Sequence, residues 1–209
     1  MNLKSLYTIT PEIIGGEAGK LQYTAYCPII TKPENRATQT INNFSRHACG
    51  EFIKYACELG REICEESSVT RCYQLMFSSR FLISFKYEMR MFDEKKEPFI
   101  FAAGSVWNTS CGSAAGLKEF FRGNVRYREM ILYILSGKIK EKEASGEKLC
   151  PDWHSRLYAA WKNMGYYLCK EGFVFLLPPK TIKAEETRTS EILVTFAEIK
   201  NQLGGRLLT

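Results

Sequence analysis

The chain has 209 residues, of which 45% are hydrophobic and 13% aromatic, so it can bury a full core and does not have the composition of a disordered protein. Its formal net charge of +6 comes from 29 basic and 23 acidic side chains spread along the chain, so we expect no nucleic-acid partner. The length predicts a single domain, residues 1–209.

Two strands are predicted first, over residues 5–10 and 20–30, joined across Gly15-Gly16. Pro28 and Pro33 close this segment, because proline cannot donate to a sheet. The residues of the second strand that share one face are Leu21, Tyr23, Ala25 and Cys27.

A long helix is predicted over about residues 34–66, with Asn35 or Thr31 capping its start. Apolar residues at spacings of three and four form a stripe expected to face the core: Ile41, Phe44, Ala48, Phe52, Tyr55, Leu59 and Ile63. Ile53, Cys57 and Cys64 fall on another flank. Either a second element covers that flank, which we favour, or the three residues form a contact surface for a partner.

Three consecutive strands are predicted over residues 72–77, 80–92 and 98–108, connected by Ser78-Ser79 and by the charged turn 93–97. The middle strand alternates between polar and apolar residues, which predicts one buried face. The residues expected on that face are Phe81, Ile83, Phe85, Tyr87 and Met89.

Helical elements follow a glycine- and serine-rich crossing at residues 108–124, which ends in an amphipathic turn. A second helix is predicted over residues 125–143, and a third begins after Pro151, with Asp152 in its first turn. The residues expected to face inward are Leu117, Phe120 and Phe121 of the turn, Met130, Ile131, Ile134 and Leu135 of the second helix, and Trp153, Leu157, Ala160 and Trp161 of the third.

The last stretch, residues 166–200, predicts a short strand at 166–169, an apolar strand at 173–177 that stops at Pro178-Pro179, an alternating strand at 191–196 and a final helical turn. The whole pattern predicts an α+β fold, in which an antiparallel sheet is packed by one long helix in the N-terminal half and by two later helices.

Eight cysteines occur without any Cys-x-x-Cys pair, at spacings that match no zinc site. An even number permits disulfides, but we favour reduced thiols, because a chain with a good core does not need them. We expect no cofactor and no metal. The chain shows neither a signal peptide nor an apolar run long enough to span a membrane, so we expect a cytoplasmic protein. An extracellular location is the alternative if the chain is a fragment of an exported protein.

No motif indicates catalysis. His47 lies in the middle of the long helix, and a nucleophile pair of His154 with Cys111 or Cys150 has no local support. Residues 111–113 lack the strand–turn–helix context of a nucleophile elbow, and no phosphate-binding glycine loop occurs. The arginines near Tyr127 (Arg122, Arg126 and Arg128) are typical of a solvated helix face. We therefore assign no catalytic, cofactor-binding or metal-ligating residue.

The order of elements resembles the RsiV-like domain family, which forms the outer part of the sigma-V anti-sigma factor and also accompanies some bacterial polysaccharide deacetylases. The resemblance covers roughly residues 10–200. It rests on Gly172-Phe173-Val174-Phe175 followed by Pro178-Pro179, on the segment 192–199, on FLISFKYEMRMF, on Gly104-Ser105-Val106-Trp107-Asn108 through Gly112, and on Leu117-Lys118-Glu119-Phe120-Phe121.

The resemblance implies a non-catalytic binding or sensing module with a protein partner, either a lysozyme-like protein or a component of the sigma pathway. The alternative is a small hydrolase or transferase with a site across the sheet, which would show convergent polar groups in a cleft. A third hypothesis is glycan binding, marked by exposed Trp107, Trp153 or Trp161, although their apolar surroundings favour a place in the core. A binding module would instead show an exposed apolar patch or an open sheet edge.

Overall fold

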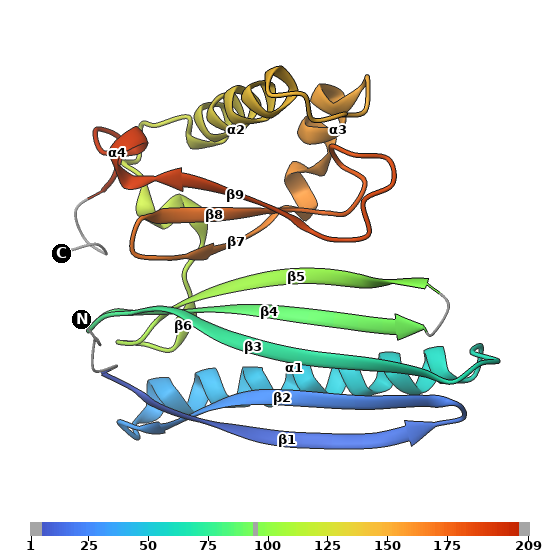
Figure 1. Cartoon of the computed structure of the whole chain (residues 1–209). Helices are drawn as coiled ribbons and strands as arrows, with labels where there is room; N and C mark the ends of the chain where they lie inside the picture. The colour runs from blue at the N-terminus through green and yellow to red at the C-terminus, as the bar shows by residue number, and fades with distance from the viewer. Residues whose placement is uncertain (1–5, 94–95, 205–209) are drawn as a thin grey trace.

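The structure is a computed structural model that describes residues 6–93 and 96–204, and it has the predicted mixed α+β fold (Figure 1). The large sheet contains, in spatial order, β1 (Thr8–Ala18), β2 (Leu21–Lys32), β3 (Ser67–Ser78), β4 (Leu82–Asp93), β5 (Lys96–Asn108) and β6 (Ser113–Ala114). The small sheet contains β7 (Gly165–Leu168), β8 (Gly172–Leu177) and β9 (Ser190–Thr195). The α-helices are α1 (Arg36–Gly60), α2 (Tyr127–Ala144), α3 (Trp153–Ala160) and α4 (Phe196–Ile199), and 3₁₀ turns span Leu117–Phe120 and Trp161–Asn163.

The first hairpin turns later than the sequence predicted. Gly15 and Gly16 lie inside β1, and the chain reverses at Gly19, whose φ of +62° favours glycine. Gly16 has a packing role, because a Cβ there would overlap the ring of Tyr23 on β2. Pro28 does not end the second strand either. It lies within β2, beyond Ala25, the last β2 residue that pairs with β3, so its missing N–H interrupts no ladder on that side.

One pair of strands in the large sheet is parallel, because α1 carries the chain from the end of β2 back to the start of β3. Of the two predicted caps, Asn35 rather than Thr31 begins the helix, and it forms a reciprocal capping box with Thr38. It ends at Gly60 rather than near residue 66. Gly60 packs on the β1–β2 turn, where a Cβ would overlap the backbone of Ala18.

The buried face of α1 is rotated from the predicted stripe. The residues that are buried are Ala37, Thr38, Ile41, Asn42, Ser45, Cys49, Phe52, Ala56 and Gly60. Most of these side chains are small, which lets the helix approach β2 closely. Phe44 and Tyr55, which the stripe placed in the core, are instead 49% and 43% exposed. Of the residues predicted on the other flank, Ile53 packs against the core and Cys57 is half-buried, whereas Cys64 lies beyond the end of α1 and is exposed.

The three predicted strands in the middle of the chain form the antiparallel meander β3–β4–β5. Glu94 and Lys95 of the predicted charged turn lie outside the described residues. The prediction of one buried face on β4 holds only for its second half. Leu82 and Ser84 are also fully buried, because the small sheet packs on the face that was expected to be solvated.

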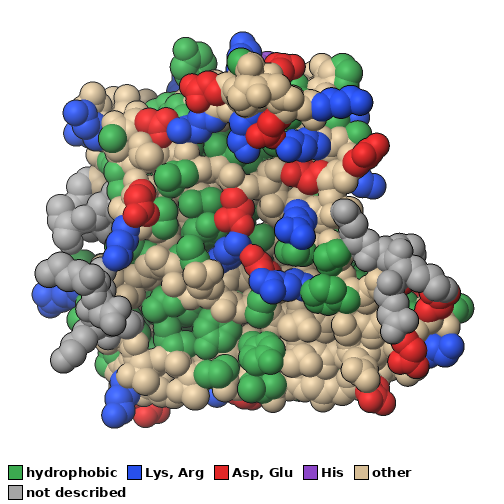
Figure 2. Space-filling model, viewed as in Figure 1, with side chains coloured by type: hydrophobic (Ala, Val, Ile, Leu, Met, Phe, Trp, Pro, Cys, Tyr) green, Lys and Arg blue, Asp and Glu red, His purple; other side chains and the backbone are tan. Residues whose placement is uncertain are grey.

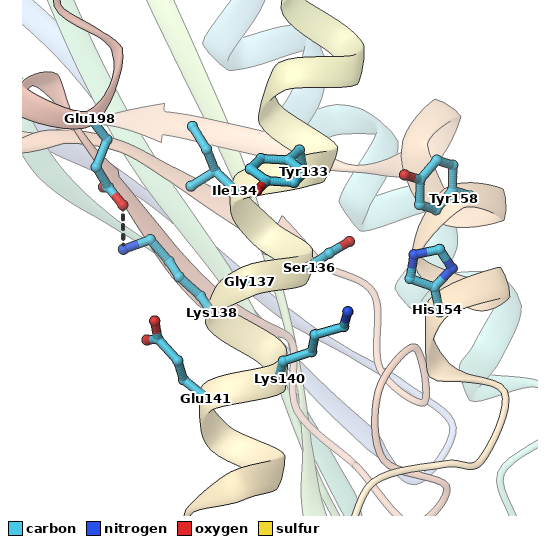
Figure 3. Close-up of a pocket in the computed structure, with 10 residues that line it drawn as sticks. All are labelled: Tyr133, Ile134, Ser136, Gly137, Lys138, Lys140, Glu141, His154, Tyr158 and Glu198. Carbon is cyan, nitrogen blue, oxygen red and sulfur yellow. Dashed lines mark ion pairs between the residues drawn. The ribbon is translucent and has the colours of Figure 1, made fainter.

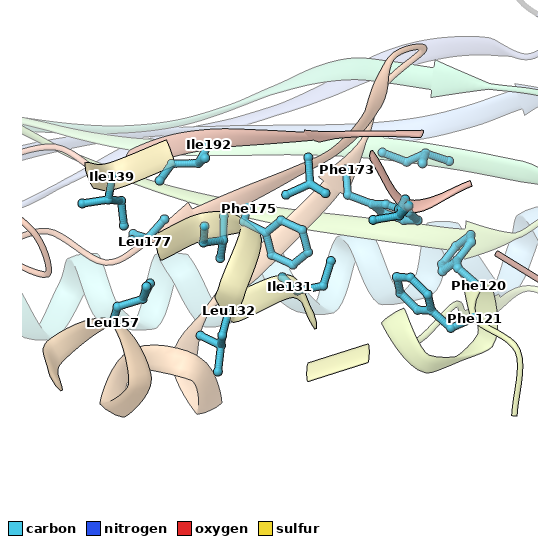
Figure 4. Packing of buried hydrophobic residues seen from close by; sticks show 14 of the residues in the cluster. Phe120, Phe121, Ile131, Leu132, Ile139, Leu157, Phe173, Phe175, Leu177 and Ile192 are labelled. Carbon is cyan, nitrogen blue, oxygen red and sulfur yellow. The ribbon is translucent and has the colours of Figure 1, made fainter. Parts of the chain in front are cut away.

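The small sheet forms a second layer, with α2 and α3 on its outer side (Figure 1). Within β8, Val174 and Leu176 pack towards the large sheet, while Phe173, Phe175 and Leu177 pack towards the helices (Figure 4). Burial on both faces explains why this strand is wholly apolar. The inward residues of α2 are Ile131, Leu132, Leu135 and Ile139, whereas Met130 and Ile134 are only partly buried.

Acidic and basic side chains gather between the two layers on the face shown in Figure 2. Lys86 of β4 lies 2.8 Å from Glu88 and 2.5 Å from Glu191 of β9, and Glu88 also pairs with Arg90 at 2.5 Å. The hydroxyl of Tyr167 donates to Glu191 at 2.6 Å. This network joins β4 to the small sheet and leaves Glu88 and Glu191 paired.

Candidate functional site

An apolar groove opens on the α1 side of the large sheet, where the helix leaves β4 and β5 uncovered. Its volume is about 450 Å³, which lies within the range of ligand-binding clefts. The helix contributes Phe44, Ala48, Phe52 and Tyr55, and the strands contribute Arg71, Tyr87, Glu88, Met89, Phe101, Ala103, Gly104 and Ser105. Phe101 is 39% exposed, so aromatic residues of the helix and of β5 face one another across open space.

Packing fixes the walls of this groove. The ring of Phe44 meets the buried ring of Trp107 edge to face, with centroids 4.7 Å apart. The Trp107 indole donates to the Ser105 hydroxyl at 2.9 Å, and Ser105 lies 3.4 Å from the hydroxyl of Tyr87. Burial raises the pKa of the Tyr87 hydroxyl, which therefore stays neutral. The groove is thus preformed rather than assembled by flexible side chains.

Arg71 is the charged residue beneath the groove. Its Nη1 donates to the sulfur of Cys49 at 3.0 Å, and its guanidinium carbon lies 4.6 Å from the centroid of the Tyr87 ring. Among the described residues no carboxylate forms an ion pair with Arg71, and Glu88, which lines the groove, is paired with Lys86 and Arg90. Arg71 therefore has the Cys49 sulfur, and no carboxylate, as its partner beneath an aromatic surface.

Cys27 and Cys49 lie together beside Arg71, and both are fully buried. A hydrogen bond from the Cys27 thiol and the charge of Arg71 lower the pKa of Cys49, whereas the same hydrogen bond and burial raise the pKa of Cys27. The pair therefore contains one thiol with a lowered pKa, Cys49, and one with a raised pKa, Cys27. All eight cysteines are free in the structure.

Sequence reasoning assigned no site residues and missed this arrangement. The sequence signal that could have revealed the site is an arginine among the inward-facing residues of one strand, which are Val69, Arg71, Tyr73 and Leu75. It was missed because the predicted strand began at Cys72. The half-exposed Phe44 and Tyr55 were assigned to the core, since periodicity does not distinguish a buried stripe from the wall of a groove.

A second hollow lies between α2 and α3 (Figure 3). Ser136 points from α2 towards His154 and Tyr158 on α3, and its hydroxyl is buried without a partner among the described residues. The other walls are mostly charged, and Lys138 is paired with Glu198 at 2.9 Å. His154 stacks near Tyr158, with ring centroids 4.9 Å apart, and makes no hydrogen bond to Cys111 or Cys150 within the described residues.

A third hollow, of about 830 Å³, lies between the loop at residues 148–152 and the loop at residues 183–188. Burial raises the pKa of Glu186, which accepts a hydrogen bond from Ser190. Its second carboxylate oxygen has no partner among the described residues. A carboxyl group in this state can transfer a proton. Two of the basic residues that line this hollow, Arg156 and Lys183, are paired with Asp152 and Glu147.

The remaining sequence candidates lie on the surface or in the core. Trp107 and Trp153 are 4% and 6% exposed, and Trp161 is partly buried, as their apolar surroundings favoured. Arg122, Arg126 and Arg128 are exposed, and His47 is exposed on α1. Within the described residues, no three His, Cys, Asp or Glu side chains cluster as metal ligands. No helix in this part of the chain is long and apolar enough to cross a membrane.

Comparison with solved structures shows the same fold in two bacterial proteins. A member of the DUF3298 family from Bacteroides fragilis superposes with a TM-score of 0.67 and 11% identity, covering 96% of this chain and 95% of that one. A DUF3298 family protein from Pseudomonas aeruginosa superposes with a TM-score of 0.60 and 8% identity, covering 99% and 97%. No family model and no curated protein matches the sequence. At these identities the likeness establishes the fold alone.

Proposed function

We propose that this protein is a non-catalytic binding module that holds a protein partner at the groove between α1, β4 and β5. The observation that carries the proposal is the groove itself, in which Phe44, Tyr55 and Phe101 remain 39–49% exposed on a preformed surface. Aromatic residues that converge on an open apolar surface are typical of the centre of a protein interface. The sequence resemblance to the RsiV-like family makes lysozyme the first partner to test, and a component of a sigma pathway the second.

The test compares two phenylalanines of similar exposure. Phe101 lines the groove and is 39% exposed, whereas Phe92 on β4 is 45% exposed and does not line it. Binding of lysozyme to the wild-type chain and to Phe101→Glu and Phe92→Glu is measured by calorimetry. A partner recovered by affinity capture from lysate is measured in the same way. We expect Phe101→Glu to weaken binding by about tenfold or more, because a carboxylate is introduced into an apolar contact, and Phe92→Glu to bind as the wild type does.

Equal binding by both variants would remove the groove from the interface. A chain that binds neither lysozyme nor any partner from lysate would favour the second candidate function, a small hydrolase or transferase. The observation that favours this candidate is the half-buried carboxyl of Glu186, whose pKa is raised by burial, beside the hollow between residues 148–152 and 183–188. A substrate whose turnover disappears in Glu186→Gln would establish it.

A further inference from the structure

We propose that the groove receives an acidic side chain of the partner with an apolar neighbour, and that the carboxylate pairs with Arg71. This inference rests on the proposed function and specifies the chemistry of the partner. It identifies Arg71 as the residue that selects for charge, while the aromatic walls select for an apolar contact.

Arg71 has more hydrogen-bond donors than the chain supplies acceptors for among the described residues. A guanidinium has five N–H donors and no acceptor, and the hydrogen bond that Arg71 makes among the described residues goes to a sulfur, which is a weak acceptor. A charge that is partly withdrawn from water is normally paired, because desolvation without a counter-charge is unfavourable. A carboxylate arriving from outside the chain would supply a counter-charge and two acceptor oxygens for the donors that the Cys49 sulfur does not engage.

The position of the guanidinium is the second argument. Tyr87 stacks on it and Cys49 holds one nitrogen, so it is oriented before any ligand binds. Phe52 and Met89 line the same groove and give the surroundings of Arg71 an apolar character, which strengthens a charge-assisted hydrogen bond. Glu88, the acid that lines the groove, is engaged by Lys86 and Arg90 and does not take this role.

The exposure of the groove walls favours a side chain of a protein partner over a free small acid as the ligand. A dedicated small-molecule site buries most of its ligand, typically 70–90% or more of the ligand surface. Here the walls themselves are 39–49% exposed at Phe44, Tyr55 and Phe101, so a free acid would remain half in water. A protein partner would cover these rings with the residues that flank its acidic side chain.

The experiment uses 4-phenylbutyrate as a probe for an acidic side chain with an apolar neighbour, and 4-phenylbutyramide as its uncharged counterpart. Binding of each to the full chain is followed by nuclear magnetic resonance, with Arg71→Met as the test variant. Arg128→Met is the matched control, because Arg128 also lies over an aromatic ring, 5.8 Å from the centroid of Trp161, but outside the groove. We expect the carboxylate to bind about tenfold tighter than the amide in the wild type and in Arg128→Met, and equally to the amide in Arg71→Met.

If both probes bind the wild type with equal affinity and shift the resonances of Phe44 and Phe101, the groove binds apolar groups but Arg71 does not select for a negative charge. That result would overturn this inference. Binding of neither probe would overturn this inference, and if Phe101→Glu also leaves partner binding unchanged, the proposed site falls with it. A series of straight-chain carboxylates separates the two sources of acid. Affinity that rises steadily from six to twelve carbons would indicate a lipid ligand and contradict a side chain, whose apolar contact saturates early.

Discussion

Cys49 combines a buried position with a lowered pKa, and the two come from different neighbours. Burial on α1 against β2 disfavours the thiolate, but the hydrogen bond from Cys27 and the charge of Arg71 favour it more strongly. Glu12, whose charge opposes ionisation, is the acid that acts on the pair. The net effect lowers the pKa of Cys49 from 9.0 to about 7.

We therefore predict that one thiolate forms as the pH rises through about 7, below the usual range for cysteine. Thiolate absorbance at 240 nm, recorded from pH 5 to 9 as the difference between the wild type and Cys49→Ser, measures it without requiring access for a reagent. Arg71→Met should move this step to higher pH, because it removes a charge that stabilises the thiolate. A difference spectrum that stays flat below pH 8 would contradict the prediction.

Asn42 joins α1 to the part of β2 that no longer pairs with β3. Its amide accepts from the Ile30 N–H at 2.8 Å and donates to the Ile30 carbonyl at 2.9 Å, in a buried environment. The side chain thus replaces the missing neighbouring strand for one residue of β2, because buried backbone groups must be paired.

Replacement of Asn42 by alanine should lower the free energy of unfolding by about 2–4 kcal/mol, because it leaves two buried backbone groups without partners. Asn43→Ala is the control, since the adjacent asparagine lies on the exposed face of the same helix. Urea denaturation followed by circular dichroism gives both values. Similar unfolding midpoints for the two variants would show that the Asn42 bridge adds no stability.

The two layers approach each other closely where Gly104 of β5 faces β7. A Cβ at residue 104 would overlap the carbonyl oxygen of Tyr166, so only glycine allows this approach. Ser84 completes the contact by accepting a hydrogen bond from the backbone N–H of Leu168 at 2.9 Å. The molecule depends on this junction, because β7 and β8 bury the second face of β4 and β5.

Gly104→Ala should therefore destabilise the whole molecule by about 1–3 kcal/mol or more, through overpacking against backbone that cannot move aside. Gly137→Ala provides the opposite case. Gly137 is exposed on α2 with nothing within 4 Å of its Cβ position, so alanine should raise stability by up to about 1 kcal/mol. Thermal unfolding of both variants checks the pair, and a Gly104→Ala chain as stable as the wild type would refute close packing at the junction.

Most of the helices and strands, and the fold class, follow from local patterns in the amino-acid sequence. Local chemistry is enough for the Asn35 cap, for the alternating strand at 80–92 and for the apolar β8, because caps, periodicity and proline stops act within a few residues. The position of the first turn was predicted wrongly, because a glycine pair is equally typical of a turn and of a strand that a neighbouring side chain approaches closely. Only the tertiary structure showed that Gly16 makes room for Tyr23.

The groove was decided by the tertiary structure alone. Helical periodicity gives the apolar arc of α1 but not which part of it meets the sheet. That choice follows from the small residues Ser45, Cys49 and Ala56, which dock on β2 and leave Phe44 and Tyr55 at the border. The role of Arg71 also depends on tertiary structure. A carboxylate that pairs with it could come from any part of the chain, and only the packed structure shows that no described carboxylate forms an ion pair with it.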